Sequence, residues 1–187
     1  MTDRWVNDEV INFYMNLLME RSEKKNNVPV LKIYSMNTFF IPRLLKHGFI
    51  GVRRWTLKVD ILEKDIIVVP VHVSGVHWCM AIIHLKNKSI KYYDSMGIPN
   101  PKVLSALEEY LKEESLDKKK IAFDTSGFLI ESVNDVPRQM NSTDCGVFSC
   151  MFAEYITRDK AITFSQEHME YFRQKMIVEI VGGELLQ

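Results

Sequence analysis

Residues 66–93 read IIVVPVHVSGVHWCMAIIHLKNKSIKYY, and this stretch decides the fold class. Three runs rich in β-branched and aromatic residues, at 66–73, 78–83 and 90–93, predict three strands. The short connection at 86–88 favours an antiparallel hairpin between the last two strands. The runs are apolar almost without interruption, which is typical of strands covered on both faces. The stretch therefore predicts a central sheet with helices packed on it.

Two helices are predicted before this stretch. The first begins after Asn7 or Asp8, either of which can cap it, because apolar residues then recur at helical spacing. The second lies around residues 38–46 and stops at Gly48. Pro42 lies inside this second pattern, so the helix either kinks there or carries the proline in its first turn.

Three more helices and one further strand are predicted after the stretch. Asn100 followed by Pro101 opens a helix that ends in the charged run 113–120, and we read the lysines at the end of that run as solvated. Other helices begin near residues 144–145 and at residue 165, and 121–130 is a candidate strand. The pattern as a whole predicts an α+β fold with a central mixed sheet flanked by helices.

Composition limits the class of protein. The 187 residues include 24 Lys and Arg against 24 Asp and Glu, which suits one domain over residues 1–187 and argues against a nucleic-acid or polybasic membrane-binding protein. No apolar run reaches the roughly 18–20 residues that span a bilayer, and residues 1–5 contain no secretory signal. An odd number of cysteines suggests thiols in a reducing compartment. We therefore expect a soluble intracellular protein, with any targeting segment upstream of Met1.

Cys145 is the first candidate for chemistry. It precedes Gly146 at the start of an amphipathic helix, where backbone N–H groups and the helix dipole stabilise a thiolate. That is a suitable position for a nucleophile. A buried structural cysteine is the more common interpretation of a single cysteine beside a helix, so Cys145 alone decides little.

His77, Asp94 and Gln139 give Cys145 the partners that a cysteine protease needs. His77 begins one strand and Asp94 follows the next, so a tight hairpin brings them to one edge of the sheet. There the carboxylate can orient an imidazole that moves the thiol proton. Gln139 lies just upstream of Cys145, where an amide can donate to an oxyanion. Each residue has an ordinary structural interpretation, a packed histidine or a solvated glutamine, but their joint occurrence favours catalysis.

The sequence resembles the SUMO-specific proteases, the sentrin/ubiquitin-like-protein cysteine proteases. The resemblance covers nearly the whole chain in order, and the chain order His, Asp, Gln, Cys differs from that of papain, in which Cys comes first. The matching segments are Trp5-Val6-Asn7-Asp8, Asn37-Thr38-Phe39-Phe40, Arg54-Trp55-Thr56, Val76-His77-Trp78, Tyr93-Asp94-Ser95-Met96-Gly97, Gln139-Met140-Asn141 and Asp144-Cys145-Gly146-Val147-Phe148.

The resemblance implies a papain-like fold and a role for each matching residue. Cys145 would be the nucleophile, His77 the general base and acid, Asp94 its orienting carboxylate and Gln139 an oxyanion donor. Two tryptophans would sandwich a Gly-Gly tail so closely that larger side chains clash. Core packing is the alternative for the tryptophans, and solvation is the alternative for the charged residues. The implied substrate-binding residues are Trp5, Trp78, Asp8, Phe39, Arg54, Trp55 and His72.

The resemblance also implies an activity and a setting. The expected reaction is cleavage after the C-terminal Gly-Gly of SUMO, which matures SUMO precursors and removes SUMO from lysine side chains. The expected partners are therefore SUMO precursors and SUMO-conjugated proteins, with no direct contact to nucleic acid or membrane. We expect a monomer without a cofactor, forming the C-terminal part of a longer protein in the nucleus, with the cytoplasm as a second location.

Other interpretations stay open at this point. The same chemistry can serve another ubiquitin-like protein, and a catalytically silent SUMO-binding module is an alternative of a different class. A zinc site is disfavoured because the spacing of His72, His77 and Cys79 matches no standard pattern. The chain also departs from the family pattern, with Leu57 at a usually basic position, a loop lengthened by one residue at 74–75, and an arginine before Gln139 where relatives often carry glutamine.

Overall fold

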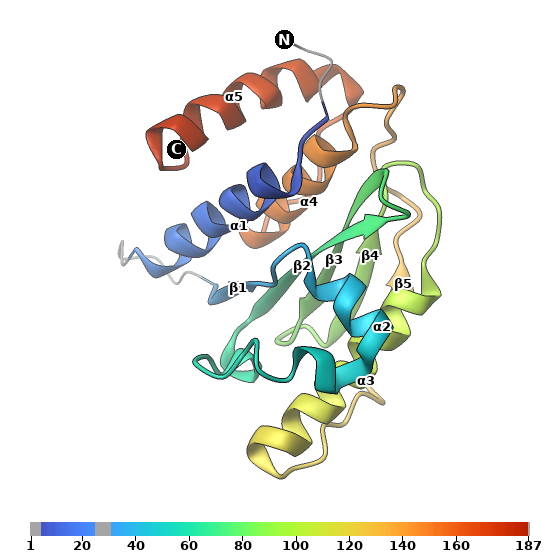
Figure 1. The fold of residues 1–187 in the computed structure, drawn as a ribbon. Helices are drawn as coiled ribbons and strands as arrows, with labels where there is room; N and C mark the ends of the chain where they lie inside the picture. The colour runs from blue at the N-terminus through green and yellow to red at the C-terminus, as the bar shows by residue number, and fades with distance from the viewer. Residues whose placement is uncertain (1–4, 25–30, 187) are drawn as a thin grey trace.

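The computed structural model describes residues 5–24 and 31–186, and these residues form one five-stranded sheet (Figure 1). The strands lie in chain order across the sheet. β2, β3 and β4 are antiparallel neighbours, whereas β1 is parallel to β2 and β5 is parallel to β4. The predicted α+β class with a central mixed sheet is thus confirmed. The strands are β1 (Ile33–Ser35), β2 (Ile66–Val73), β3 (His77–His84), β4 (Ser89–Tyr93) and β5 (Leu129–Ser132).

Helices cover both faces of the sheet (Figure 1). One layer consists of α1 (Asp8–Glu23), α4 (Cys145–Thr157) and α5 (Met169–Gly182), and the other of α2 (Phe40–Val52) and α3 (Pro101–Lys119). Because side chains alternate along a strand, β3 sends its even-numbered residues into the first layer and its odd-numbered residues into the second. Two short 3-10 helices, Ile61–Glu63 and Gln166–His168, complete the regular structure of the described residues. None of their helices is long and apolar enough to cross a bilayer.

The structure shows how α1 and α2 begin and where α2 ends, which the sequence left open at Asn7 and Pro42. Asn7, not Asp8, caps α1, because its side chain accepts a hydrogen bond from the N–H of Val10 at 3.0 Å. Pro42 lies in the first turn of α2, where its missing N–H costs no helical hydrogen bond. Gly48 interrupts α2 with φ +62°, as predicted, but the helix resumes and ends at Val52. This last turn was not predicted from the sequence.

One predicted strand needs correction, and one observed strand was not predicted. Residues 121–128 contain no strand, and only Leu129–Ser132 of that region pairs with β4. β1 was not predicted, because its three residues are too few to show an alternating pattern. Both strands lie at the edges of the sheet, whereas the three central strands form where residues 66–93 predict them.

The lysine run at the end of α3 was predicted to be solvated, but two of its lysines form ion pairs. Lys118 Nζ lies 2.6 Å from the carboxylate of Glu114, whose side chain is only 1% exposed. The hydroxyl of Thr56 donates to the same carboxylate at 2.6 Å, and Lys118 also donates to the Thr56 carbonyl oxygen. Lys119 pairs with Asp60 at 2.8 Å. The end of α3 therefore anchors the segment that follows α2.

A second buried carboxylate ties α1 to α5. Glu179 is fully buried, and its Oε2 accepts a hydrogen bond from the hydroxyl of Tyr14 at 3.0 Å. Lys175 Nζ and the backbone N–H of Leu186 contact its Oε1 at 3.0 and 2.9 Å. A buried carboxylate without such donors would be strongly destabilising, so these contacts hold the outer helix on the core.

We expect Tyr14→Phe to lower the free energy of unfolding by about 1–3 kcal/mol, because Glu179 Oε2 then loses its hydroxyl donor. Urea unfolding followed by circular dichroism measures the change. Tyr171→Phe is the matched control, since Tyr171 is 62% exposed on the same helix pair and should change stability by no more than about 0.5 kcal/mol. Equal stability of the two variants would contradict the role of the Tyr14 hydroxyl.

Candidate active site

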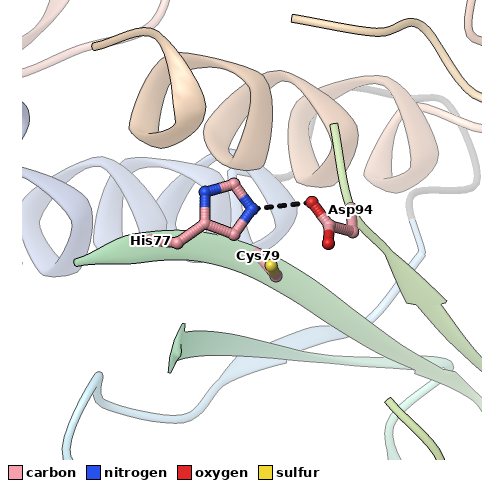
Figure 2. Close-up of side chains that lie close together, drawn as sticks. All are labelled: His77, Cys79 and Asp94. Carbon is pink, nitrogen blue, oxygen red and sulfur yellow. Dashed lines mark hydrogen bonds and ion pairs between the residues drawn. The ribbon is translucent and has the colours of Figure 1, made fainter. Parts of the chain in front are cut away.

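The β3–β4 register brings His77 to Asp94. Met80 and Tyr93 are the last paired residues at this end of the hairpin, so one further step places Cys79 opposite Asp94. His77 lies two residues further along β3, on the same side as Cys79, and is thus a diagonal neighbour of Asp94. His77 Nε2 and Asp94 Oδ1 are 2.6 Å apart, and the other ring nitrogen of His77 is turned away from the carboxylate (Figure 2).

The loop after β4 holds the Asp94 carboxylate in place. Backbone N–H groups of Met96 and Ile98 donate to its two oxygens at 2.8 and 3.1 Å. Burial alone would raise the pKa of this carboxyl, but the hydrogen bonds from His77 and from these two N–H groups lower it below its usual value. Asp94 is therefore ionised and free to orient the imidazole.

Cys145 is the first residue of α4 and is only 2% exposed. Burial raises the pKa of its thiol, but hydrogen bonds with His77 and with the backbone N–H groups of Trp78 and Gly146 outweigh burial and lower that pKa. Burial has the opposite effect on His77 and lowers its pKa, because the charged form is the protonated one. The hydrogen bonds of His77 with Asp94 and Cys145 outweigh burial and raise its pKa to about 12. The two residues therefore favour a thiolate–imidazolium pair.

Asp144 fixes the start of α4 without capping it. Its side chain makes no capping hydrogen bond; instead it accepts hydrogen bonds from Asn141 and Gln166, both at 2.7 Å, and from Arg173 of α5 at 2.6 Å. Burial would raise the pKa of Asp144, but these three donors lower it. This cluster was not predicted, because nothing in the sequence connects Arg173 or Gln166 with a loop more than twenty residues away.

Gln139 is attached to the Asp94 loop. Its backbone N–H donates to the carbonyl oxygen of Ser95, the residue after Asp94, at 3.0 Å. The structure thus joins His77 to Asp94 by a hydrogen bond, places Cys145 near enough to His77 that each shifts the pKa of the other, and ties the segment that carries Gln139 to the loop after β4.

Five of the seven predicted substrate residues line one hollow beside α1. Its volume is about 470 Å³. Trp78 donates its indole N–H to the Val6 carbonyl oxygen at 2.9 Å. The imidazole of His72 stacks on the indole, with 4.0 Å between the ring centroids and an interplanar angle of 9°. His72 therefore covers one face of the Trp78 ring. The hollow is lined by Trp5, Val6, Asn7, Asp8, Thr38, Phe39, Pro42, His72, Gly75 and Trp78.

The segment around Val6 crosses the start of α4 at close range. A Cβ atom at Gly146 would lie 2.7 Å from the Val6 Cβ, closer than real side chains approach one another. Glycine after Cys145 thus has a packing reason. Trp5, which precedes Val6, remains 48% exposed.

The other two predicted substrate residues, Arg54 and Trp55, line a second hollow of about 450 Å³. The Trp55 ring packs edge-on against Phe40 at 5.7 Å, so it is fixed by the core. Leu57, which departs from the family pattern, lines the same hollow and is 64% exposed.

The lengthened loop between β2 and β3 is a tight turn. Ser74 and Gly75 have φ values of +52° and +72°, and the N–H of Val76 donates to the Val73 carbonyl oxygen at 3.1 Å. A serine at positive φ is strained relative to glycine. The turn nevertheless delivers His77 to Asp94, as the 2.6 Å contact shows.

His77, Cys79 and Asp94 also form a group whose potential ligand atoms all lie within 4.8 Å of one another (Figure 2). Metal binding would require a Cys79 thiolate, but burial raises the pKa of this thiol. The hydrogen bond between His77 and Asp94 already uses two of the ligand atoms. The chemistry of the group therefore fits a hydrogen-bonded pair of His77 and Asp94 beside a neutral Cys79 thiol better than a metal site.

The sequence matches known proteins over nearly its whole length. Residues 4–181 match the family model of the Ulp1 protease family, C-terminal catalytic domain. A sentrin-specific protease of Caenorhabditis elegans is 50% identical over 97% of this chain and 26% of its own length. Human sentrin-specific protease 2 is 45% identical over 97% of this chain and 31% of its own length. The chain thus spans about a quarter to a third of these curated relatives.

Solved structures show the same fold. The yeast Ulp1 protease domain in complex with Smt3, the yeast ortholog of SUMO, has a TM-score of 0.79 and 32% identity, covering 96% of this chain and 77% of that one. The catalytic domain of the Ulp1-like SUMO protease of Chaetomium thermophilum has a TM-score of 0.86 and 26% identity, covering all of this chain and 76% of that one. Because the family model spans residues 4–181 and a curated relative is 50% identical over 97% of this chain, this chain belongs to the Ulp1 protease family of cysteine proteases.

Proposed function

We propose that this chain is a thiol protease that cleaves after the C-terminal Gly-Gly of SUMO, both in SUMO precursors and in isopeptide conjugates with lysine. The observation that carries the reaction class is the hydrogen bond of His77 with Asp94, together with the proximity by which His77 lowers the pKa of the Cys145 thiol. The choice of SUMO is supported by the relatives, which are described as sentrin-specific and SUMO proteases.

In the first half of the reaction, the Cys145 thiolate attacks the carbonyl carbon of the terminal glycine and forms a tetrahedral intermediate. Backbone N–H groups in the first turn of α4, which have no helical partner, and the Gln139 amide can donate to its oxyanion. The imidazolium of His77 then gives its proton to the leaving lysine amine. The carbon–nitrogen bond breaks and a thioester remains on Cys145.

In the second half, neutral His77 takes a proton from water, and the hydroxide attacks the thioester carbonyl carbon. The carbon–sulfur bond breaks, SUMO leaves with a glycine carboxyl group that releases its proton to the solvent, and Cys145 returns to the thiolate form beside protonated His77. Asp94 stays ionised throughout and keeps the ring turned toward Cys145.

Burial of the nucleophile favours a thin substrate. Cys145 is 2% exposed, and the Val6 segment crosses directly over Gly146. A glycine tail can approach such a thiol, whereas any side chain next to the scissile bond would meet the surrounding protein. Recognition of the folded modifier would then fall to the two hollows that contain Trp5 and Arg54.

The first prediction concerns the reaction and the modifier together. A SUMO probe with an electrophile in place of its last carboxylate should form a covalent adduct with the wild type, because the Cys145 thiolate attacks that position. Cys145→Ser should form none, yet it should still bind a SUMO conjugate. Gel shift and mass spectrometry detect the adduct.

Ubiquitin and a second ubiquitin-like probe serve as controls for the modifier. Labelling by one of these instead of SUMO would keep the mechanism and replace the substrate. If no probe labels while SUMO still binds, the chain is a binding module and not a protease.

The second prediction concerns pH. Because the pKa of Cys145 is lowered and that of His77 is raised, the thiolate persists below the pKa of an ordinary cysteine, about 8.5. Iodoacetamide should therefore alkylate Cys145 with an apparent pKa below that value, and His77→Ala should move the apparent pKa upward. Alkylation is followed by mass spectrometry from pH 5 to 10, with Cys145→Ser as the blank. An unchanged profile in His77→Ala would rule out the ion pair.

The third prediction concerns the hollow beside α1. Trp5→Ala should raise the KM for a SUMO precursor about tenfold, because a half-exposed aromatic ring that lines the hollow is lost. Its melting temperature should stay the same, since Trp5 is outside the core. Phe13→Ala is the matched control, because Phe13 is 41% exposed on α1 and does not line the hollow. Equal KM values for the two variants would remove Trp5 from the binding site.

A further inference from the structure

Gln139 is held at two points by one buried residue. The hydroxyl of Ser95 donates to Gln139 Oε1 at 2.6 Å, and the carbonyl oxygen of Ser95 accepts the backbone N–H of Gln139 at 3.0 Å. Ser95 itself is 1% exposed. Water cannot easily replace the hydroxyl at such a position, so the oxygen end of the amide depends on Ser95 for its donor.

The surroundings also determine which end of the Gln139 amide faces which way. Gln139 Nε2 lies 2.6 Å from the carbonyl oxygen of Asn141, and a carbonyl can only accept. The nitrogen must therefore face Asn141 and the oxygen must face Ser95, whose hydroxyl acts as the donor. One N–H of the Nε2 group goes to Asn141, and the second is left for another acceptor.

The two anchors of the amide belong to two different parts of the catalytic centre. Ser95 directly follows Asp94. Asn141 is fixed to the start of α4, because its Oδ1 accepts the N–H groups of Thr143 and Asp144 at 3.0 Å each, and its Nδ2 donates to the Asp144 carboxylate at 2.7 Å. The amide is thus suspended between the residue after Asp94 and the turn that ends at Cys145.

We propose that Ser95 is a positioning residue, which fixes the amide of Gln139 so that its remaining N–H points at the developing oxyanion. The inference rests on the proposed protease function and deepens it. A donor stabilises a transition state only if it already lies in place when the charge develops, and the loss of one such donor costs about 10²–10³-fold in kcat. Without the Ser95 hydroxyl the amide can rotate about its side-chain bonds, and part of that factor is lost.

The test is a four-protein cycle of the wild type, Ser95→Ala, Gln139→Ala and the double variant. The substrate is a precursor of whichever modifier labels Cys145 in the probe panel, so a change of modifier leaves the test intact. Ser95→Ala should lower kcat by about 10–100-fold with KM changed by less than about twofold. In the Gln139→Ala background the same substitution should lower kcat by less than about twofold, because Ser95 acts through Gln139.

Independent, multiplicative losses in the cycle would overturn the inference, as would a wild-type kcat in Ser95→Ala. Ser142→Ala is the matched control in the loop before Cys145, since Ser142 is exposed and should leave kcat unchanged. Cleavage by the wild type and by Ser142→Ala reports on the proposed function, whereas the ratios within the cycle report on Ser95. The failure of one is thus distinguishable from the failure of the other.

Two further measurements separate positioning from a general structural role. Alkylation of Cys145 by iodoacetamide forms no oxyanion, so its rate should be the same in Ser95→Ala and wild type; a slower rate would mean that Ser95 acts through Asp94 and His77 instead. If Ser95→Ala does not fold, Ser95→Cys carries the test, because a thiol has similar shape and is a weaker donor. It should also lower kcat at constant KM, and a wild-type kcat in a folded Ser95→Cys would overturn the inference.

Discussion

The register of the β3–β4 hairpin is the constraint on which the candidate catalytic centre depends. A slip of one residue would turn every side chain of one strand to the other face and separate His77 from Asp94. Packing on both faces opposes that slip, since Trp78, Met80 and Ile82 are fitted into one layer and Cys79, Ala81 and Ile83 into the other. Core packing on both faces therefore fixes the 2.6 Å hydrogen bond between His77 and Asp94 at the end of these two strands.

Cys145, the proposed nucleophile, reaches this end of the strands through a separate set of contacts. α4 packs on β3, and its first residue is positioned by the Asp144 carboxylate, which Asn141, Gln166 and Arg173 hold from three directions. Half of the centre thus depends on the sheet and the other half on the junction of α4 with α5. Hydrogen bonds between Ser95 and Gln139 join the two halves.

The sequence predicted the parts of this arrangement that depend on local order. Strands 66–73, 78–83 and 90–93 appear within a residue or so of their observed bounds, and the meeting of His77 with Asp94 follows from a tight hairpin. The stack of His72 on Trp78 was missed, although the two residues are direct partners across β2 and β3, because their pairing depends on the conformation of the 74–76 turn. Arg173 was also missed, since a tertiary ion pair leaves no periodic signal.

The contact between Arg173 and Asp144 has a consequence for protein engineering. Residues 158–164 connect α4 to α5 without taking part in the sheet, so a chain cut there would leave Cys145 and Asp144 on one fragment and Arg173 on the other. A buried carboxylate deprived of its partner is costly, and each fragment would stay inactive alone. If the two fragments were fused to two proteins that bind each other, the ion pair could form again. The recovered protease activity would then report that the two proteins are in contact.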